Sequence, residues 1–171
     1  MEIPVSGGTD QAPVTVLGIP SGGLGAYQFE LRYDPAVVQV TDVLGGAIPF
    51  DGAPAAVNID NTSGAGGTGL GLVQWNDFQA GQSPVTAAQN VANVQLQSAV
   101  DATVGSCSPL TLTVIELVDN QAVAIPSVTL NGEVCLVSAV GILAETGLTA
   151  DLDAGNGGVF ASIDLIKDGS G

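Results

Sequence analysis

Short stretches in which apolar and polar residues alternate fill the first three quarters of this chain. In AYQFELRYD (26–34), Tyr27, Phe29, Leu31 and Tyr33 alternate with polar residues. A period of two predicts a half-buried β-strand, because successive side chains of a strand point to opposite faces. The other strand-like stretches are PVTVLGI (13–19), VVQVTDVL (37–44), AAVNID (55–60), GLGLVQWND (69–77), QNVANVQLQSAV (89–100), CSPLTLTVIELVD (107–119) and IPSVTLNGEVCL (125–136).

The residues between these stretches are rich in Gly, Pro, Asn and Asp, which are typical of turns. A helical period is weak throughout. In residues 89–100, Ala92, Leu96 and Ala99 would share one helix face, but the alternation of Val94 and Leu96 with polar neighbours fits a strand better. Short strands at this spacing predict an all-β fold, either a two-sheet β-sandwich or a jelly roll.

The only two cysteines, Cys107 and Cys135, each belong to a strand-like stretch. If the two strands form one long hairpin, a Cys107–Cys135 pair centres the turn on Gln121, inside the turn-like sequence DNQA. This arrangement predicts a disulfide between neighbouring strands and an oxidising compartment. The alternative is two buried free thiols in a cytosolic protein. In the second strand of this hairpin, Val128 and Leu130 alternate with Thr129 and Asn131.

Residues 138–171 differ from the rest of the chain. They have an apolar first part, a Gly-rich acidic middle and an amphipathic end, and a sandwich does not need them. We therefore divide the chain into an N-terminal arm (1–11), a β-sandwich body (12–137) and a C-terminal extension (138–171). The extension is either an appendage or a strand that leaves one subunit to pair with another.

The charge balance narrows the classes of partner. Seventeen acidic residues face only two basic ones, Arg32 and Lys167, so the formal net charge is −15. Nucleic acids and anionic membranes are therefore poor partners, because both are bound through clustered Lys and Arg. No apolar stretch approaches the roughly 20 residues of a membrane-spanning helix. The chain has no His, the commonest acid–base catalyst, which argues against an enzyme.

Several segments of the body resemble the cohesin domain. The most specific is YQFELRYDPAVVQVTDV (27–43), in which a strand of alternating large apolar residues leads to Tyr-Asp-Pro and a second aliphatic run. GLVQWNDF (71–78), VANVQLQSAV (91–100) and IPSVTLNGEVCLV (125–137) are similar to later cohesin strands. The resemblance implies a jelly roll of about nine strands. It also implies an extracellular, non-catalytic module that binds a dockerin through one face of a sheet.

The extension resembles a dockerin calcium loop in a degenerate form. In DAGNGGVFASID (153–164), Asp153 is first and Asp164 twelfth, but the third and fifth positions are Gly155 and Gly157, which offer no side-chain oxygen. Neighbouring oxygens would have to compensate, and an ordinary turn is the alternative. The calcium ligands expected on this resemblance are Asp151, Asp153, Asn156 and Asp164.

Two other features carry weaker signals. Asn61-Thr62-Ser63 is a glycosylation sequon in a loop-like region. Trp75 would stack on a sugar ring if it lay exposed on a flat face, whereas strand aromatics such as Tyr27 and Phe29 are expected in the core. The glycines of GAGGTGLG (64–71) predict a flexible loop, because no helix follows to complete a phosphate site.

Three functions fit these observations. The first is an interaction module of cohesin type, whose partner is a dockerin-like segment or another copy of the chain associating head-to-tail. The second is the subunit of a surface filament or homo-polymer, in which GVFASIDLI (158–166) or the N-terminal MEIPVSGG arm completes a neighbour's sheet. The third is a carbohydrate-binding module. In the second of these functions, the donor-strand residues that share one face and would point inward are Val159, Ala161, Ile163 and Leu165.

Overall fold

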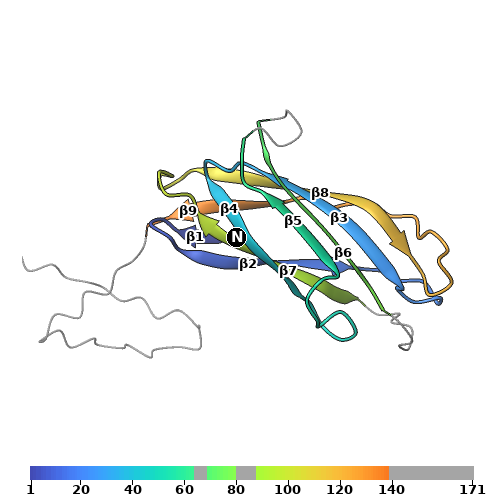
Figure 1. The fold of residues 1–171 in the computed structure, drawn as a ribbon. Helices are drawn as coiled ribbons and strands as arrows, with labels where there is room; N and C mark the ends of the chain where they lie inside the picture. Colours follow the sequence, from blue (N-terminus) through green and yellow to red (C-terminus); the bar gives the residue numbers. More distant parts are fainter. Residues whose placement is uncertain (64–68, 80–87, 139–171) are drawn as a thin grey trace, which may run out of the picture. The chain divides into compact units, whose positions relative to one another are not determined.

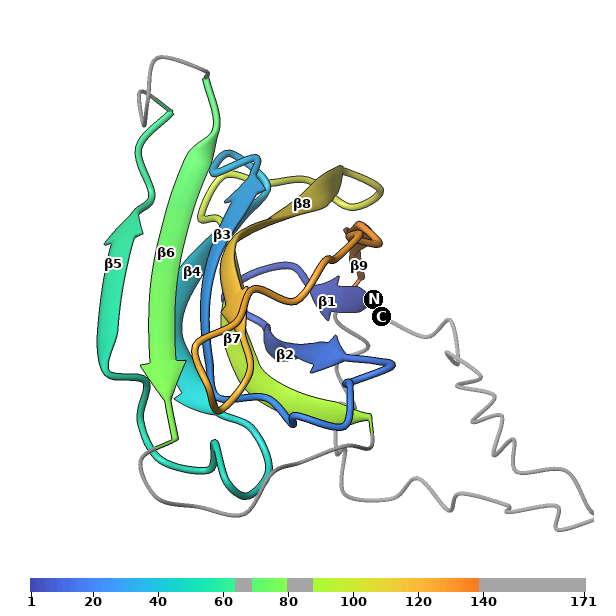
Figure 2. The same ribbon diagram turned by 90° about the vertical axis from the view of Figure 1, so that its right-hand side faces the viewer.

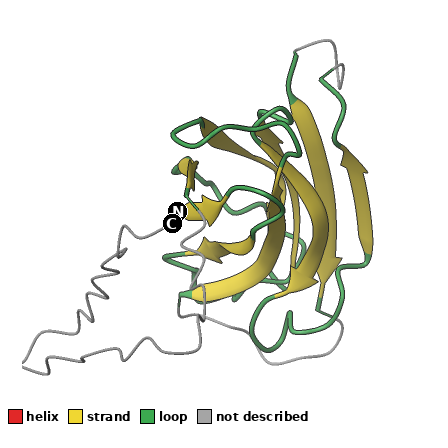
Figure 3. Ribbon diagram, turned by 90° about the vertical axis from the view of Figure 1, so that its left-hand side faces the viewer, coloured by secondary structure: helices red, strands yellow, loops and turns green. Residues whose placement is uncertain are grey.

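The structure is a computed structural model that describes residues 1–63, 69–79 and 88–138. All regular elements of these residues are strands (Figure 3). No helix among these residues is long and apolar enough to cross a membrane. The nine strands are β1 (Glu2–Pro4), β2 (Thr9–Val16), β3 (Ala26–Tyr33), β4 (Val38–Gly45), β5 (Ala56–Asp60), β6 (Gly71–Phe78), β7 (Gln89–Ser98), β8 (Cys107–Val118) and β9 (Gly132–Val137).

The strands form two sheets, which confirms the predicted all-β sandwich (Figures 1 and 2). One sheet has six strands in the order β1-β9-β8-β3-β6-β5, and the other has three in the order β2-β7-β4. The β1–β9 pair is parallel, and every other pair is antiparallel. Most strands adjacent in sequence lie in different sheets, as in a jelly roll rather than a meander, and only the β5–β6 and β8–β9 pairs are consecutive strands of one sheet.

Strand β3 lies in the middle of the six-stranded sheet and carries the clearest alternation. Tyr27, Phe29, Leu31 and Tyr33 are buried, whereas the residues between them are half-buried. The Phe29 ring lies 4.8 Å from Tyr27 and 5.6 Å from Trp75 of β6, measured between ring centroids. These contacts build an aromatic centre under β3 and β6, where large rings bury the most apolar surface.

The three-stranded sheet closes the other side of this core with aliphatic residues. Val40 of β4 and Val94 and Leu96 of β7 are buried against the aromatic layer. The Tyr27 hydroxyl donates a hydrogen bond of 2.9 Å to the Val91 carbonyl, so the two sheets are also joined by a polar contact. Burial raises the pKa of the Tyr27 hydroxyl above its ordinary value, because the phenolate would lose its hydration.

The Asp34-Pro35 corner carries the chain from one sheet to the other, as its sequence indicates. The Asp34 carbonyl accepts from the Val37 and Val38 N–H groups at 3.1 and 3.0 Å. The Asp34 carboxylate accepts from the Ala36 N–H at 2.9 Å. Pro35 suits this turn because its ring holds φ at a turn-forming value.

Residues of the predicted N-terminal arm (1–11) contribute to both sheets of the sandwich. Glu2–Pro4 pairs with β9 of the same chain, and Ile3 is completely buried. Strand β2 then starts at Thr9, four residues earlier than its apolar pattern indicated. The apolar pattern does not show this start, because Thr9–Gln11 are polar. Polar residues are common in an edge strand, which has one sheet face in water.

The second strand of the cysteine hairpin is shorter than predicted. Strand β9 covers only Gly132–Val137, and residues 126–131 belong to no strand. Val128 and Leu130, the apolar residues of the predicted alternation, are 93% and 86% exposed. The predicted turn does occur, because the Ala122 N–H donates to the Asp119 carbonyl at 3.0 Å. The prediction of a strand is therefore wrong for residues 126–131, which lie next to the turn.

Candidate protein-binding surfaces

The outward side of strands β8, β3, β6 and β5 forms a broad surface that we call the outer sheet face. The pairing registers bring its side chains into rows. Glu30 of β3, for example, lies between Thr113 of β8 and Gln74 of β6, and Asn58 of β5 follows Gln74. The face consists of Gln28, Glu30, Arg32, Ala56, Asn58, Asp60, Leu72, Gln74, Asn76, Thr111, Thr113 and Glu116.

A polar cluster lies at the centre of the outer sheet face. Arg32 Nε lies 2.7 Å from Glu30 Oε1, and Gln74 Nε2 donates to Glu30 Oε2 at 2.8 Å. Both oxygens of the Glu30 carboxylate are therefore engaged. The side chains are partly shielded, so the pair contributes at most about 1 kcal/mol to stability. Its larger consequence is that three long side chains are held in place before a partner arrives.

The chemistry of the outer sheet face suits contact with another protein. Half of its side chains are neutral amides and hydroxyls, which can donate and accept hydrogen bonds across an interface. At the β5 end, hydrogen bonds from Thr62 hold the pKa of Asp60 below its ordinary value. At the other end of β6, burial raises the pKa of Asp77. These two carboxylates are on different strands and form no acid–base pair with a nucleophile.

A second surface feature is an apolar groove on the side of the sandwich where β2 faces β8. Its volume is about 770 Å³. Val14 and Val16 of β2 line one wall, Leu112 and Val114 of β8 line the other, and Phe29 lies among the lining residues. We call it the β2–β8 groove. Residues 126–131 form its rim and leave its mouth open to solvent.

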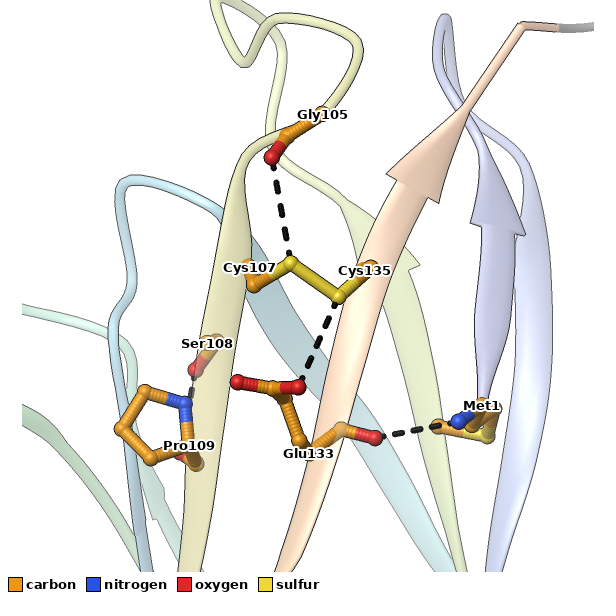
Figure 4. Close-up of a disulfide and its surroundings, with 7 residues drawn as sticks. All are labelled: Met1, Gly105, Cys107, Ser108, Pro109, Glu133 and Cys135. Carbon is orange, nitrogen blue, oxygen red and sulfur yellow. Dashed lines mark hydrogen bonds between the residues drawn. A yellow bond between two sulfur atoms is a disulfide. The ribbon is translucent and has the colours of Figure 1, made fainter.

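The predicted disulfide is present between β8 and β9 (Figure 4). Cys107 and Cys135 are direct partners in the antiparallel register, with their Cα atoms 4.0 Å apart. The Cys135 N–H also donates to the Met1 carbonyl at 2.9 Å, and the Met1 ammonium donates to the Glu133 carbonyl at 3.1 Å. The disulfide therefore lies at the point where β8, β9 and the N-terminus meet.

The disulfide accounts for the only group of potential metal ligands in the described part of the chain. That group is Cys107, Glu133 and Cys135, and both sulfur atoms are bonded to each other. The predicted calcium ligands Asp151, Asp153, Asn156 and Asp164 lie outside the described residues. The same is true of the donor-strand residues Val159, Ala161, Ile163 and Leu165, and of most of the Gly-rich loop.

Trp75 lies in the core rather than on a flat face. Only 1% of its surface is exposed, and its ring contacts Phe29. Tyr27 and Tyr33 are equally buried. In the folded chain, therefore, none of these three rings can stack on a sugar, which removes the observation on which a carbohydrate-binding module would rest.

Asn61 of the sequon connects the two sheets. Its Oδ1 accepts from the Tyr33 hydroxyl at 2.6 Å and from the Val40 N–H at 2.9 Å, and its Nδ2 donates to the Val40 carbonyl at 2.9 Å. Burial raises the pKa of Tyr33 to about 12. Glycosylation of Asn61 stays a prediction, but a glycan on Nδ2 would occupy an atom that the fold uses.

Sequence reasoning did not single out either the outer sheet face or the groove. The signal for the face was present in AYQFELRYD, since Gln28, Glu30 and Arg32 are the polar half of its alternation. The register that places Glu30 beside Gln74 depends on pairing between strands far apart in the sequence. No local pattern indicates that pairing.

Several solved cohesin structures have a similar fold. The seventh type I cohesin of ScaB from Pseudobacteroides cellulosolvens is 18% identical, with a TM-score of 0.59 over 82% of this chain and 90% of that one. The third cohesin of ScaC from Acetivibrio cellulolyticus, solved in complex with the ScaB dockerin, is 16% identical, with a TM-score of 0.61 over 80% and 93%. A non-cellulosomal cohesin from the archaeon Archaeoglobus fulgidus is 23% identical, with a TM-score of 0.56 over 80% and 86%.

A search among curated proteins gave no match. The family comparison is decisive, because the model described as "Cohesin domain" matches residues 6–135. The match covers every strand from β2 to β8 and most of β9, including the outer sheet face and the disulfide. The chain belongs to the cohesin domain family.

Proposed function

We propose that this protein binds a dockerin-type protein partner through its outer sheet face. Cohesin domains mediate protein–protein interaction with dockerins, and the Acetivibrio cohesin above was solved in such a complex. The observation that carries the proposal is the Glu30–Arg32–Gln74 cluster, which holds polar groups ready at the centre of a flat four-stranded surface. Preorganised polar groups lower the entropic cost of binding.

The proposal includes an extracellular or cell-surface location and no catalytic activity. The disulfide supports the location, because such bonds persist in oxidising compartments. The family supports the absence of catalysis, because cohesins are interaction modules. The archaeal relative is described as non-cellulosomal, so the partner need not belong to a cellulosome.

Calorimetric titration with dockerin domains encoded in the same genome tests the proposal. Asn76→Arg places a long charged side chain on the outer sheet face and should weaken binding at least about tenfold, because hot spots lie near the centre of an interface. Gln95→Arg makes a comparable change on the outward side of β7 in the other sheet and should leave the affinity unchanged. Absence of binding by every dockerin, or sensitivity to Gln95→Arg alone, would refute the proposal.

A second candidate function is head-to-tail assembly by strand addition, in which residues 159–165 of one copy complete the sheet of another. The observation that favours it is the open edge of β8: among the described residues, no strand pairs with Thr111–Glu116 on the side away from β3. Such an edge can accept an extended segment, with the backbone supplying affinity and alternate side chains supplying register. Repeated addition of this kind would give an open polymer.

Negative-stain microscopy tests this assembly. The full chain should form large particles, and a chain that ends at Ser138 should not. Ile163→Asp with Leu165→Asp keeps the length of the chain but places charges on the inward face of the donor strand, so it should act like the truncation. Large particles from the truncated chain would contradict the idea.

Calcium binding by the extension is a separate proposal, with Asp151, Asp153, Asn156 and Asp164 as ligands. Carboxylate and amide oxygens are the ligands that Ca²⁺ takes in proteins. Direct calorimetric titration with Ca²⁺ should detect binding to the wild-type chain and none to Asp153→Ala. Equal binding by the two chains, or none by the wild type, would remove calcium from these residues.

A further inference from the structure

Residues 126–131, which we call the strap, leave an edge of the sheet uncovered. Strand β9 pairs with β8 only from Cys107 to Leu110. Beyond this point, Leu112 N–H donates to the side chain of Asn131 at 3.1 Å instead of to a strand. The described residues place no backbone partner opposite Val114 on this side. An edge with unpaired N–H and C=O groups favours the addition of a strand.

The chain on both sides of the strap follows one register. At the far end, Cys107 lies opposite Cys135 and Leu110 opposite Gly132. At the turn, Val118 bridges to Ala124, and Ile125 N–H donates to the Leu117 carbonyl at 2.8 Å. All these pairs share one centre, Gln121. The strap therefore has as many residues as the uncovered stretch of β8, Thr111–Glu116. The hydrogen bonds of the two ends differ in phase, because Leu136 N–H donates to the Ser106 carbonyl whereas Ile125 N–H donates to the Leu117 carbonyl, and the register of β8 against β3 shifts between Val114 and Glu116. A strap that continues the β9 ladder can therefore pair regularly with β8 as far as Val114.

The same register decides which way the strap's side chains would point. Val134 and Leu136 of β9 face the core and are almost completely buried. Because side chains in a strand alternate, a strand extended backwards through the strap would turn Leu130 and Val128 to that same side. Leu130 would then lie opposite Leu112, and Val128 opposite Val114.

The β2–β8 groove is where those two side chains would go. Leu112 and Val114 are its β8 wall, and both are only partly buried although they pack against the core. The groove holds about 770 Å³, which is ample space for two aliphatic side chains. Burial there would remove both the exposed side chains and the groove wall from water, and apolar burial is the main favourable term in such a closure.

We propose that the strap closes onto β8 as a continuation of β9, with Val128 and Leu130 filling the β2–β8 groove. In the open arrangement the edge of β8 is free for an incoming strand, and in the closed arrangement the chain's own strap occupies it. The strap therefore controls access to this edge. The inference does not depend on which partner the outer sheet face binds, because the groove lies on the inward side of β8.

Nuclear Overhauser spectroscopy on the full chain tests the closure directly. In the closed strand, Thr113 and Thr129 are a non-hydrogen-bonded pair whose Hα atoms face each other, because such pairs have the shortest Cα separation in an antiparallel ladder. A cross-peak between these two Hα atoms is expected, together with slow exchange of the Val114 amide. Absence of the cross-peak, with fast Val114 exchange, would overturn the proposal.

A pair of matched substitutions gives a second, independent readout. Val128 and Val100 are 93% and 90% exposed in the open structure, so exposure alone predicts the same small effect for both. Closure predicts that Val128→Ser lowers the melting temperature by about 4 °C, because a buried valine is lost. Val100→Ser should change it by less than about 1 °C. Equal effects of the two substitutions would overturn the proposal.

A mixed sample of labelled and unlabelled chains distinguishes closure within one chain from exchange between chains. A Thr113–Thr129 cross-peak that stays within a single chain supports the strap. A cross-peak that arises only between a labelled and an unlabelled chain would overturn it in favour of a second copy as the occupant of the groove.

Discussion

The strap (126–131) and strand β9 (132–137) are consecutive halves of one alternating segment, and they lie in opposite environments. In β9, Val134 and Leu136 are buried, whereas the corresponding residues of the strap, Val128 and Leu130, are exposed. The register of β9 on β8, if continued, would place the strap opposite Thr111–Glu116 of the same strand. The difference must therefore come from what each half contacts besides β8.

Strand β9 has three contacts that the strap lacks. Strand β1 pairs with its outer edge, the disulfide joins Cys135 to β8, and the Met1 backbone binds both Glu133 and Cys135. The strap has one side-chain hydrogen bond, from Asn131 to the Leu112 N–H. A strand paired on one side only can form, as the edge strands β2, β4 and β5 show, so it is the additional anchors of β9, and not pairing with β8 alone, that distinguish the two halves.

The largest expected effect comes from removal of the disulfide, which should make β9 more like the strap. Cys107→Ser with Cys135→Ser opens a loop with a sequence separation of 28 residues. The free energy of unfolding should fall by about 3.5 kcal/mol, because the unfolded chain regains the entropy of that loop. Urea unfolding measures this loss, and reduced wild-type protein should match the double variant. A loss below about 1 kcal/mol would show that β1 alone anchors β9.

A comparison of leucines should give a slightly smaller effect. Leu136→Ala leaves a cavity in the core and should cost about 3 kcal/mol, measured by urea unfolding. Leu130→Ala makes the same change in the strap and should cost less than half as much, because Leu130 is 86% exposed in the open arrangement and is buried only while the strap is closed. Equal losses would mean that the two halves are equally well packed.

The smallest effect should come from the strap's one hydrogen bond. Asn131→Ala removes the acceptor of the Leu112 N–H and should cost about 1 kcal/mol or less, because the site is exposed to water. The better measurement is hydrogen exchange of the Leu112 amide, which should become faster. Asn131→Asp keeps an acceptor oxygen and should preserve the slower exchange. Unchanged exchange in Asn131→Ala would mean that another group covers this amide.

Much of the fold follows from patterns that are local in the sequence. The alternation from Tyr27 to Tyr33 predicts β3 and its buried face, and Asp34-Pro35 predicts the corner that follows. The Cys107–Cys135 pairing and its turn at Gln121 are also correct, because a hairpin's register depends only on its turn. These features depend on residues close in sequence or on one two-strand ladder.

The errors and omissions involve contacts between distant segments. The buried position of Trp75 depends on which side of β6 faces β7 and β4, and the polar contacts of Asn61 depend on a neighbouring strand in the other sheet. The length of β9 depends on β1, which lies at the opposite end of the chain. The outer sheet face depends on four strands assembled in a non-sequential order.

The sequence by itself determined most of the strands, the core-facing residues of β3, the disulfide and the likeness to cohesins. It did so because alternation and turn residues act over a few positions, and because the family's motifs are contiguous. Only the tertiary structure decided which of the alternating segments form a strand with a buried face. Val128 and Val134 carry the same signal, but only the segment around Val134 has support from elsewhere in the fold, through β1, the disulfide and the Met1 backbone. That support is present for β9 and absent for the strap, which is why one closes the sandwich and the other leaves a groove.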